Sequence, residues 1–154
     1  MKISEFLSPY AILTALDAGD KSAALEALCA PVAARYPELS RRRLKEVLEE
    51  RERLGSTGIG DGVAIPHGKL PGLPGLTASF ARSTEGIEFE SLDGRPAHIF
   101  FALFAPENSA GVHLKALARI SRLLKSADLR AGILEADTAD EIYRLVTLED
   151  EKYG

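Results

Sequence analysis

The sequence contains a single cysteine, so no disulfide can form within the chain. Cys29 stands between Leu28 and Ala30 with no second Cys and no nearby His, which favours a buried structural thiol over a redox centre. The start of the chain also lacks a long apolar run, because Pro9 and Asp17 interrupt it. It therefore does not resemble a signal peptide. We expect a cytoplasmic protein with no direct membrane insertion.

An excess of basic charge is absent as well. The chain has 19 Lys and Arg against 23 Asp and Glu, a formal net charge of -4 and a pI of about 5.4, which argues against nucleic acid as a ligand. The one basic run, residues 41–43, is followed at once by glutamates at 46, 49, 50 and 52 and is best read as a solvated helix face. A docking patch for an acidic partner is the alternative. With 154 residues and 45% hydrophobic content, residues 1–154 should form a single domain.

Several motifs that would indicate a metal, nucleotide or hydrolase site are missing. The three histidines, His67, His98 and His113, form no pair with short ligand spacing, and no His-Glu-x-x-His segment exists, so we expect no metal. The glycine-rich segment 55–62 lacks the Gly-Lys-Ser/Thr of a P-loop and precedes its strand, and no glycine-flanked serine marks a hydrolase elbow. We expect no cofactor.

Hydrophobic periodicity predicts five helices, over residues 21–36, 40–54, 109–126, 127–135 and 138–146. Pro31 should kink or end the first helix early, since an interior proline removes one backbone hydrogen bond. The third helix should bury Leu114, Leu117, Ile120, Leu123 and Leu124. Residues 149–154 should fray.

Strands are predicted at residues 63–65, 77–81, 87–89 and 98–104, with loops at 55–62 and 70–76. Helices that alternate with strands and then complete the chain indicate an α/β fold, a three-layer sandwich with a β-sheet between helices.

His67 is the leading candidate for chemistry. It follows a short buried strand and lies between Pro66, which stiffens the backbone, and Gly68, which leaves room for a close approach. A neutral imidazole is a competent nucleophile near neutral pH, and a phosphoryl group could be transferred to it. Spacing alone leaves open a loop histidine that is simply bonded to backbone.

Arg51 and His113 are unusual for the faces on which they lie. Arg51 continues the apolar stripe that begins at Leu44, so either its stem packs while the guanidinium reaches water, or an anion binds there. His113 lies near the start of the third long helix and on its buried stripe. It is either a core or interface histidine or a hydrogen-bond donor to an anion held at the helix N-terminus. The pattern does not show whether His67 and His113 are close.

Three segments together resemble the mannitol/fructose-type enzyme IIA domain of the bacterial phosphotransferase system. They are Arg51-Glu52-Arg53-Leu54, the run Ser-Thr-Gly-Ile-Gly-Asp-Gly-Val-Ala-Ile-Pro-His-Gly-Lys at residues 56–69, and His113-Leu114 followed by Leu117. The match covers about residues 5–148. The segments Ser-Thr-Gly-Ile-Gly and Pro-His-Gly-Lys-Leu are most similar to those of the nitrogen-regulatory enzyme IIA.

The resemblance implies a mixed β-sheet flanked by helices and a phosphohistidine mechanism. His67 would accept a phosphoryl group from an HPr/NPr-type phosphocarrier protein, while Arg51 and His113 would line the pocket, neutralise charge and donate hydrogen bonds. Their side chains should then share one shallow, weakly apolar surface. His98 has no role in the resemblance.

Three functions are consistent with this resemblance. The first is a regulatory phosphocarrier of the nitrogen branch, whose contacts with target proteins depend on phosphorylation of His67. The second is a sugar-transport enzyme IIA that passes phosphate to a IIB domain of a fructose/mannitol-type permease. The third is a binding module that keeps the fold without turning over phosphate, which the presence of His67, Arg51 and His113 disfavours.

Overall fold

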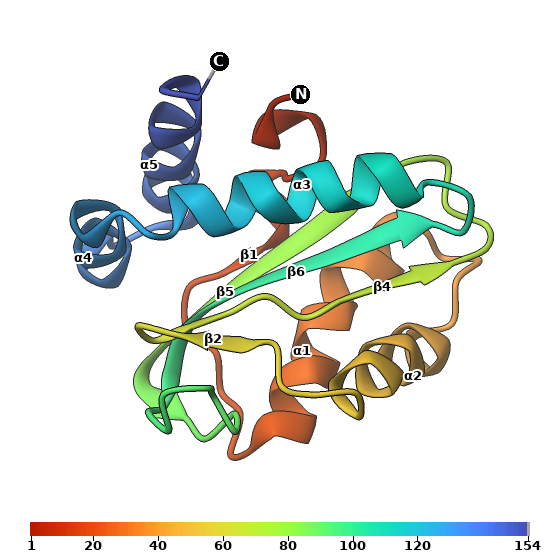
Figure 1. The fold of residues 1–154 in the computed structure, drawn as a ribbon, viewed down its shortest axis with the longest axis horizontal. Coiled ribbons are helices and arrows are strands. Elements are labelled where there is room, and N and C mark those ends of the chain that lie inside the picture. The colour runs from red at the N-terminus through yellow and green to blue at the C-terminus, as the bar shows by residue number, and fades with distance from the viewer. Residues whose placement is uncertain (154) are drawn as a thin grey trace.

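The computed structural model describes residues 1–153, and it places a β-sheet between two layers of helices (Figure 1). One layer consists of α1 (Lys21–Arg35) and α2 (Arg41–Glu52), and the other contains α3 (Ala110–Leu123), α4 (Ala127–Glu135) and α5 (Ala139–Glu151). Two short 3-10 helices, η1 (Ile3–Glu5) and η2 (Pro9–Ala11), precede the first strand. The predicted three-layer sandwich is therefore confirmed.

The sheet formed by the described residues has six strands and is mixed. These are β1 (Ile12–Leu13), β2 (Gly58–Gly60), β3 (Val63–Ala64), β4 (His67–Leu70), β5 (Thr77–Ile87) and β6 (Ala97–Pro106). The order is β1-β5-β6-β3-β2, and β4 also pairs with β6. Strand β5 runs antiparallel to β6, whereas β3 and β4 both run parallel to it.

Strands β3 and β4 are two parts of one line along the same side of β6. Val63 pairs with Ile99 and His67 pairs with Leu103, so the offset is 36 residues in both parts (99 - 63 and 103 - 67). Proline has no backbone N–H to donate, but the Pro66 carbonyl still accepts from the Leu103 N–H at 2.9 Å. His67 is therefore the first residue after the interruption between β3 and β4, and its pairing with β6 keeps it in register.

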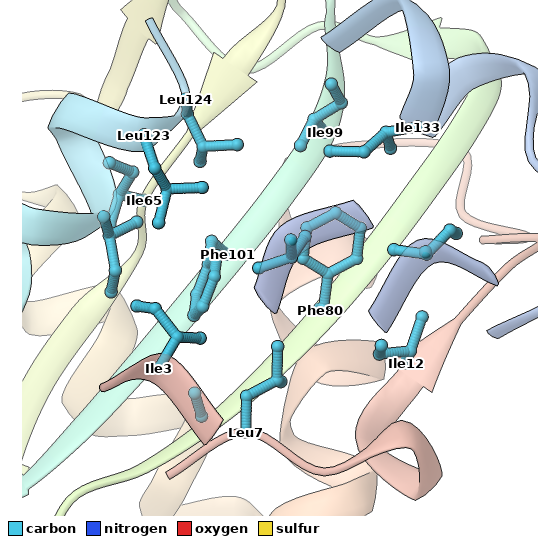
Figure 2. Close-up of a cluster of buried hydrophobic side chains, with 14 of the residues drawn as sticks. Ile3, Leu7, Ile12, Ile65, Phe80, Ile99, Phe101, Leu123, Leu124 and Ile133 are labelled. Atoms are coloured by element: carbon cyan, nitrogen blue, oxygen red, sulfur yellow. The ribbon is translucent and has the colours of Figure 1, made fainter. Parts of the chain in front are cut away.

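Each face of the sheet packs against its own apolar cluster. Figure 2 shows one cluster, where Phe80 and Phe101 of the sheet meet Leu123 of α3 and Ile133 of α4. The other cluster packs α1 and α2 against the opposite face, through Leu28, Leu44, Leu48, Phe100 and Phe104. Burial of these side chains supplies the main driving force for the fold.

Of the two outcomes predicted for Pro31, a kink or an early end of the helix, the early end is wrong, since α1 continues through Pro31 to Arg35. In the same part of α1, the buried Ser79 hydroxyl donates to the Leu28 carbonyl at 2.6 Å and joins the helix to the sheet. The flanking residues Leu28 and Val32 are buried against the sheet, so packing outweighs the lost backbone bond.

Several strands differ from the prediction, and β1 was not predicted. Residues 77–81 and 87 belong to one long strand, β5, and not to two strands, while Phe89 lies beyond its end. Strand β2 forms within the predicted loop 55–62, and β4 forms where His67 was expected to begin a loop. Pairing with distant strands stabilises these segments, and local propensity does not report such pairing.

The C-terminal helix is longer than predicted. Fraying from residue 149 onward is wrong for the first three of these residues, because α5 extends to Glu151 and the Asp150 side chain is buried. Gly154 lies outside the described residues. Among the residues that are described, no helix combines the length and the apolarity needed to cross a membrane.

Candidate functional site

His67 begins β4 at the open edge of the sheet, and one hydrogen bond sets the tautomer of its ring. Its Nδ1 lies 2.7 Å from the carbonyl oxygen of Ile65, two residues earlier. A carbonyl only accepts hydrogen bonds, so the proton of the neutral ring is on Nδ1 and the lone pair is on Nε2. The side chain is half-buried and belongs to a strand, whereas the sequence placed His67 at the junction of a strand and a loop.

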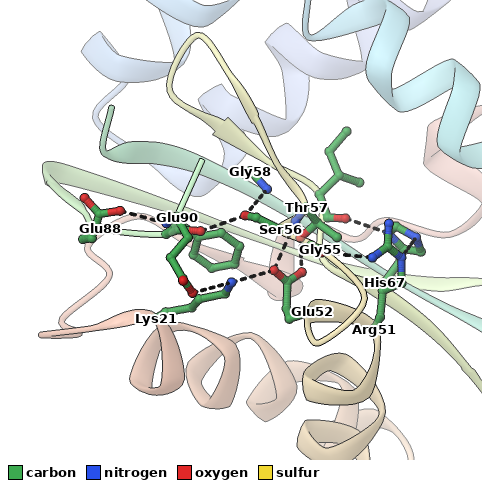
Figure 3. A network of polar contacts seen from close by, with 12 residues as sticks. Lys21, Arg51, Glu52, Gly55, Ser56, Thr57, Gly58, His67, Glu88 and Glu90 are labelled. Atoms are coloured by element: carbon green, nitrogen blue, oxygen red, sulfur yellow. Dashed lines mark hydrogen bonds and ion pairs between the residues drawn. The ribbon is translucent and has the colours of Figure 1, made fainter. Parts of the chain in front are cut away.

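Arg51, in the last turn of α2, contacts the nitrogen that carries this lone pair. Its Nε donates to Nε2 of His67 at 3.3 Å, and its Nη1 donates to the Gly55 carbonyl at 3.0 Å (Figure 3). A guanidinium is only a donor, so this contact supports the same tautomer. Two hydrogen bonds to two different groups hold the guanidinium plane beside the imidazole.

Gly68 brings α2 close enough for this contact. A Cβ at this position would overlap Cγ1 of Val47 and would stand 3.3 Å from the Val47 carbonyl oxygen. Val47 and Arg51 are one helical turn apart and face β4 together. The glycine of Pro-His-Gly therefore permits the close packing of strand and helix on which the Arg51–His67 contact depends.

His113 reaches the site from α3, in the opposite helical layer. Its ring centroid lies 5.5 Å from that of His67 with an interplanar angle of 77°. The side chain is only 6% exposed, and its Nε2 is buried without a hydrogen-bond partner among the described residues. Within residues 1–153, no side chain caps the start of α3, one turn before His113, so its first amides are available to an anion. All three predicted site residues thus lie together.

Both histidines are held in the neutral form. Burial is the main cause that lowers the pKa of His67, with the nearby Arg51 charge acting in the same direction against the Ile65 hydrogen bond. Burial also lowers the pKa of His113 to about 4, helped by His67 and Lys69. The site therefore presents an unprotonated nitrogen of His67 near neutral pH.

A groove with a volume of about 450 Å³ opens over these residues. Much of its remaining lining is apolar: Val47, Leu54, Ala110, Leu114 and Leu117. Leu54 is 84% exposed and Leu114 is 68% exposed, so the rim offers apolar surface to another molecule. The prediction that Leu114 is buried is wrong, because it is turned by about 100° from His113 on the helix and faces outward.

His98 lies away from this site. It is five residues from Leu103, the strand partner of His67, which corresponds to about 16 Å along β6. Its Nδ1 lies 2.8 Å from the Ser83 carbonyl. Nowhere in residues 1–153 do three or more His, Cys, Asp or Glu side chains gather as metal ligands would.

Glu52 is a buried residue beside the site that sequence reasoning missed. The charge pattern of its helix predicts a solvated face, yet the Glu52 side chain is only 6% exposed. The local sequence gives one indication that Glu52 belongs to the site: this residue stands directly after Arg51 and just before the glycine-rich segment. Its ion-pair partner, Lys21, comes from another helix, and no local pattern identifies that residue.

Comparison with known proteins places the chain in a family. Residues 5–148 match the family model described as "Phosphoenolpyruvate-dependent sugar phosphotransferase system, EIIA 2". The chain is 45% identical over 148 residues to the nitrogen regulatory protein of Bradyrhizobium diazoefficiens, with 96% of each chain covered. It is also 35% identical to the PTS system fructose-specific EIIABC component of Bacillus subtilis, covering 98% of this chain and 24% of that protein.

Among solved structures, the nitrogen regulatory protein IIA-Ntr of Neisseria meningitidis is similar to this chain with a TM-score of 0.88 and 34% identity. The match covers 94% of this chain and 99% of the other. The family model and these near full-length similarities agree with the fold described above. The chain belongs to the EIIA 2 family of the phosphoenolpyruvate-dependent sugar phosphotransferase system.

Proposed function

We propose that this protein is a phosphocarrier of the nitrogen regulatory branch, which accepts a phosphoryl group on Nε2 of His67 from a phosphohistidine protein of the HPr/NPr type. The observation that carries the proposal is the 2.7 Å contact between Nδ1 of His67 and the Ile65 carbonyl, which puts the proton on Nδ1 and the nucleophilic lone pair on Nε2. Similarity to proteins named nitrogen regulatory protein supports the regulatory branch.

The transfer needs no proton movement at His67. The Nε2 lone pair forms the new N–P bond while the N–P bond of the donor breaks, and that electron pair returns to the donor ring. The proton on Nδ1 stays in place. Positive charge then develops on the His67 ring, and the Ile65 carbonyl stabilises it by accepting the Nδ1–H bond.

Arg51 and His113 supply donors around the transferred group. Arg51 Nε, 3.3 Å from Nε2 in the unphosphorylated ring, can donate to a phosphoryl oxygen once Nε2 is occupied, while Nη1 keeps the Gly55 carbonyl. A neutral His113 carries one N–H donor, and the uncapped amides of α3 add a favourable dipole. Together they spread the negative charge of the phosphoryl group.

The groove suits a transient protein partner. The exposed Leu54 and Leu114 can pack against the donor's surface and exclude water during transfer. After transfer, about two negative charges stand at this rim. Target proteins that contact the same surface would therefore distinguish the two states of His67, and this distinction is the regulatory output.

Intact mass spectrometry after incubation with phosphoenolpyruvate, enzyme I and an HPr-type protein tests the proposal. The wild-type chain should gain one phosphoryl group that is lost in acid and retained in alkali. His67→Ala should gain none, whereas His98→Gln, away from the site, should be phosphorylated normally. Nitrogen-15 NMR should assign the group to Nε2. An acid-stable adduct, phosphorylated His67→Ala or modification of Nδ1 would contradict the proposal.

A sugar-transport role is the second candidate, favoured by the 35% identity with a fructose-specific EIIABC component. Phosphorylated protein can be mixed with a fructose-type IIB domain and the phosphoryl group followed by mass. Transfer to IIB as fast as acceptance from the donor would establish this role. Absence of transfer, combined with target binding that depends on the phosphorylation state, would establish the regulatory one.

A further inference from the structure

Glu52 is a buried carboxylate that the proposed transfer step does not use. It is the last residue of α2, and its side chain is only 6% exposed. Negative charge at the C-terminal end of a helix is disfavoured by the helix dipole, and burial adds a desolvation cost. Stability alone gives little reason to place a carboxylate there, because an apolar side chain would avoid both costs.

The Glu52 carboxylate ties together three parts of the chain (Figure 3). It accepts hydrogen bonds from the backbone N–H of Thr57 at 3.1 Å and from the Thr57 hydroxyl. Its third partner is Nζ of Lys21, at 2.9 Å, from the start of α1. The end of α2, the start of α1 and the segment that leads into β2 are therefore joined at one group.

The segment between Glu52 and β2 is fixed by further hydrogen bonds. The Ser56 hydroxyl donates to the Phe89 carbonyl at 2.8 Å and accepts from the Gly58 N–H at 3.0 Å. Gly55 lies between these anchored residues and the helix end. Its carbonyl is the acceptor for Nη1 of Arg51, so the position of this carbonyl determines where the guanidinium points.

Lys21 holds the Glu52 carboxylate from the side away from His67. Its side chain is 18% exposed and lies 4.8 Å from the centre of the Phe89 ring. It also contacts Glu90 at 3.3 Å, but that side chain is 76% exposed. An exposed ion pair contributes little, so the buried Lys21–Glu52 contact is the one expected to matter.

We infer that Glu52 is a positioning residue for phosphoryl transfer: anchored by Lys21, it fixes the 55–57 segment, and the Gly55 carbonyl of that segment orients Arg51 toward His67. The inference rests on the proposed function for its kinetic consequence, whereas the positioning itself is a property of the unphosphorylated protein. A misplacement of about 1 Å at a reacting centre can cost about 10²-fold in rate.

Rates of phosphoryl acceptance in four variants and a control test the inference. Glu52→Ala should slow transfer by about 10- to 100-fold and Glu52→Gln by less, since the amide can still accept from Thr57. Thr57→Val should slow transfer, and Thr57→Ser, which keeps the hydroxyl, should restore it. Glu90→Gln removes the exposed partner of the same lysine and should stay within about twofold of wild type.

NMR without any donor separates positioning from general loss of structure. Burial is the main influence on the pKa of His67, and the charge of Glu52 raises it, so Glu52→Gln should lower this pKa while Glu90→Gln leaves it unchanged. The Arg51 Nε–H signal should shift or broaden in Glu52→Ala and in Thr57→Val. The His67 pKa confirms that the Glu52 charge is close to the site, whereas the Arg51 Nε–H signal reports where the guanidinium lies, and a purely structural role for Glu52 would leave the Arg51 signal at its wild-type value.

Folded Glu52→Ala with transfer within about twofold of wild type and an unchanged Arg51 signal would overturn the inference. If that variant does not fold, the Thr57→Val and Thr57→Ser pair decides, and equal rates in these two variants would overturn it. A wild-type protein that gains no phosphate would refute the proposed function, yet the NMR signals would still show whether Glu52 positions Arg51.

Discussion

Two imidazoles whose centres lie 5.5 Å apart have different surroundings. His67 has both ring nitrogens engaged, one with the Ile65 carbonyl and one with Arg51, and the second nitrogen keeps its lone pair. His113 is more deeply buried, and its Nε2 has no partner among residues 1–153. The first geometry fits a nucleophile, and the second fits a donor waiting for an acceptor.

Removal of the Arg51 guanidinium should slow phosphoryl acceptance. Arg51→Ala deletes one preorganised donor to developing charge, for which a loss of about 10²-fold is typical. Arg51→Lys should recover only part of the rate, because an ammonium lacks the planar fork that donates hydrogen bonds to both His67 and the Gly55 carbonyl. Rapid-quench measurement of phosphoryl transfer gives the rates, with Arg53→Ala as the matched control. Equal rates in Arg51→Ala and Arg53→Ala would show that the Arg51 side chain merely packs.

His113 should make the stability of the protein depend on pH. Its pKa falls from 6.5 in the unfolded chain to about 4 in the folded protein, mainly through burial, so the unfolded state takes up a proton first as pH falls. The resulting stability is present above about pH 6.5 and is lost towards pH 4, by at most about 3 kcal/mol. Urea unfolding across this range should show a weaker pH dependence in His113→Phe. An identical dependence in both proteins would contradict the assignment.

At the scale of elements, the close contact between α2 and β4 determines whether the site can form. Gly68→Ala would force a Cβ against Val47 and push the helix away from the strand. We expect a loss of about 1–3 kcal/mol in the free energy of unfolding and slower phosphoryl acceptance, because Arg51 moves with the helix. Denaturant titration and transfer kinetics measure the two effects.

Gly75→Ala is the matched control for this variant. An added Cβ at Gly75 meets no atom within 4 Å, so the same substitution adds a methyl group without a clash. It should leave both the free energy of unfolding and the transfer rate close to the wild-type values. If Gly68→Ala behaves like this control, the approach of α2 to β4 does not depend on the glycine.

At the scale of the whole molecule, a buried carboxylate near the end of the chain joins three distant segments. Asp150 of α5 accepts from Nε of Arg119 in α3 at 2.5 Å and from the backbone N–H of Ile3 at 2.7 Å. The start of the chain accordingly lies near α3 and α5 in Figure 1. The same helix, α3, carries His113 into the site.

Asp150→Ala should therefore destabilise the fold strongly. It leaves Nε of Arg119, a side chain 14% exposed, and the Ile3 N–H without their acceptor, although Nη2 of Arg119 keeps the backbone carbonyl of residue 150, and breaking such a buried pair typically costs about 3–5 kcal/mol. Lys152→Ala, which removes an ion pair with an exposed lysine, should cost less than about 1 kcal/mol. Thermal and urea unfolding of the two variants compare these losses. Similar small effects in both would show that the Asp150 contacts add little.

The sequence by itself determined the layers of the fold, and it predicted three residues that the structure brings together. Capping residues and apolar periodicity define most helices, because these signals act within a few residues: Ser40, Ser126 and Thr138 each accept a hydrogen bond from the third residue of the helix that follows. The family resemblance selected His67, Arg51 and His113, since the chemistry of a phosphoryl site restricts which residue types can stand there. The roles of these three residues stay predictions until transfer is measured.

Only the tertiary structure decided which groups are buried and which atoms meet. Burial of Glu52 requires Lys21, 31 residues earlier (52 - 21), and burial of Asp150 requires Arg119 from another helix. Continuation of α1 past Pro31 depends on packing against the sheet, where Ser79 reaches the Leu28 carbonyl. The tautomer of His67 depends on where the Ile65 carbonyl points, and its Nε2 meets an arginine from a separate layer. Hydrogen bonds and desolvation act between atoms in contact, and only the fold brings residues so far apart in the sequence into contact.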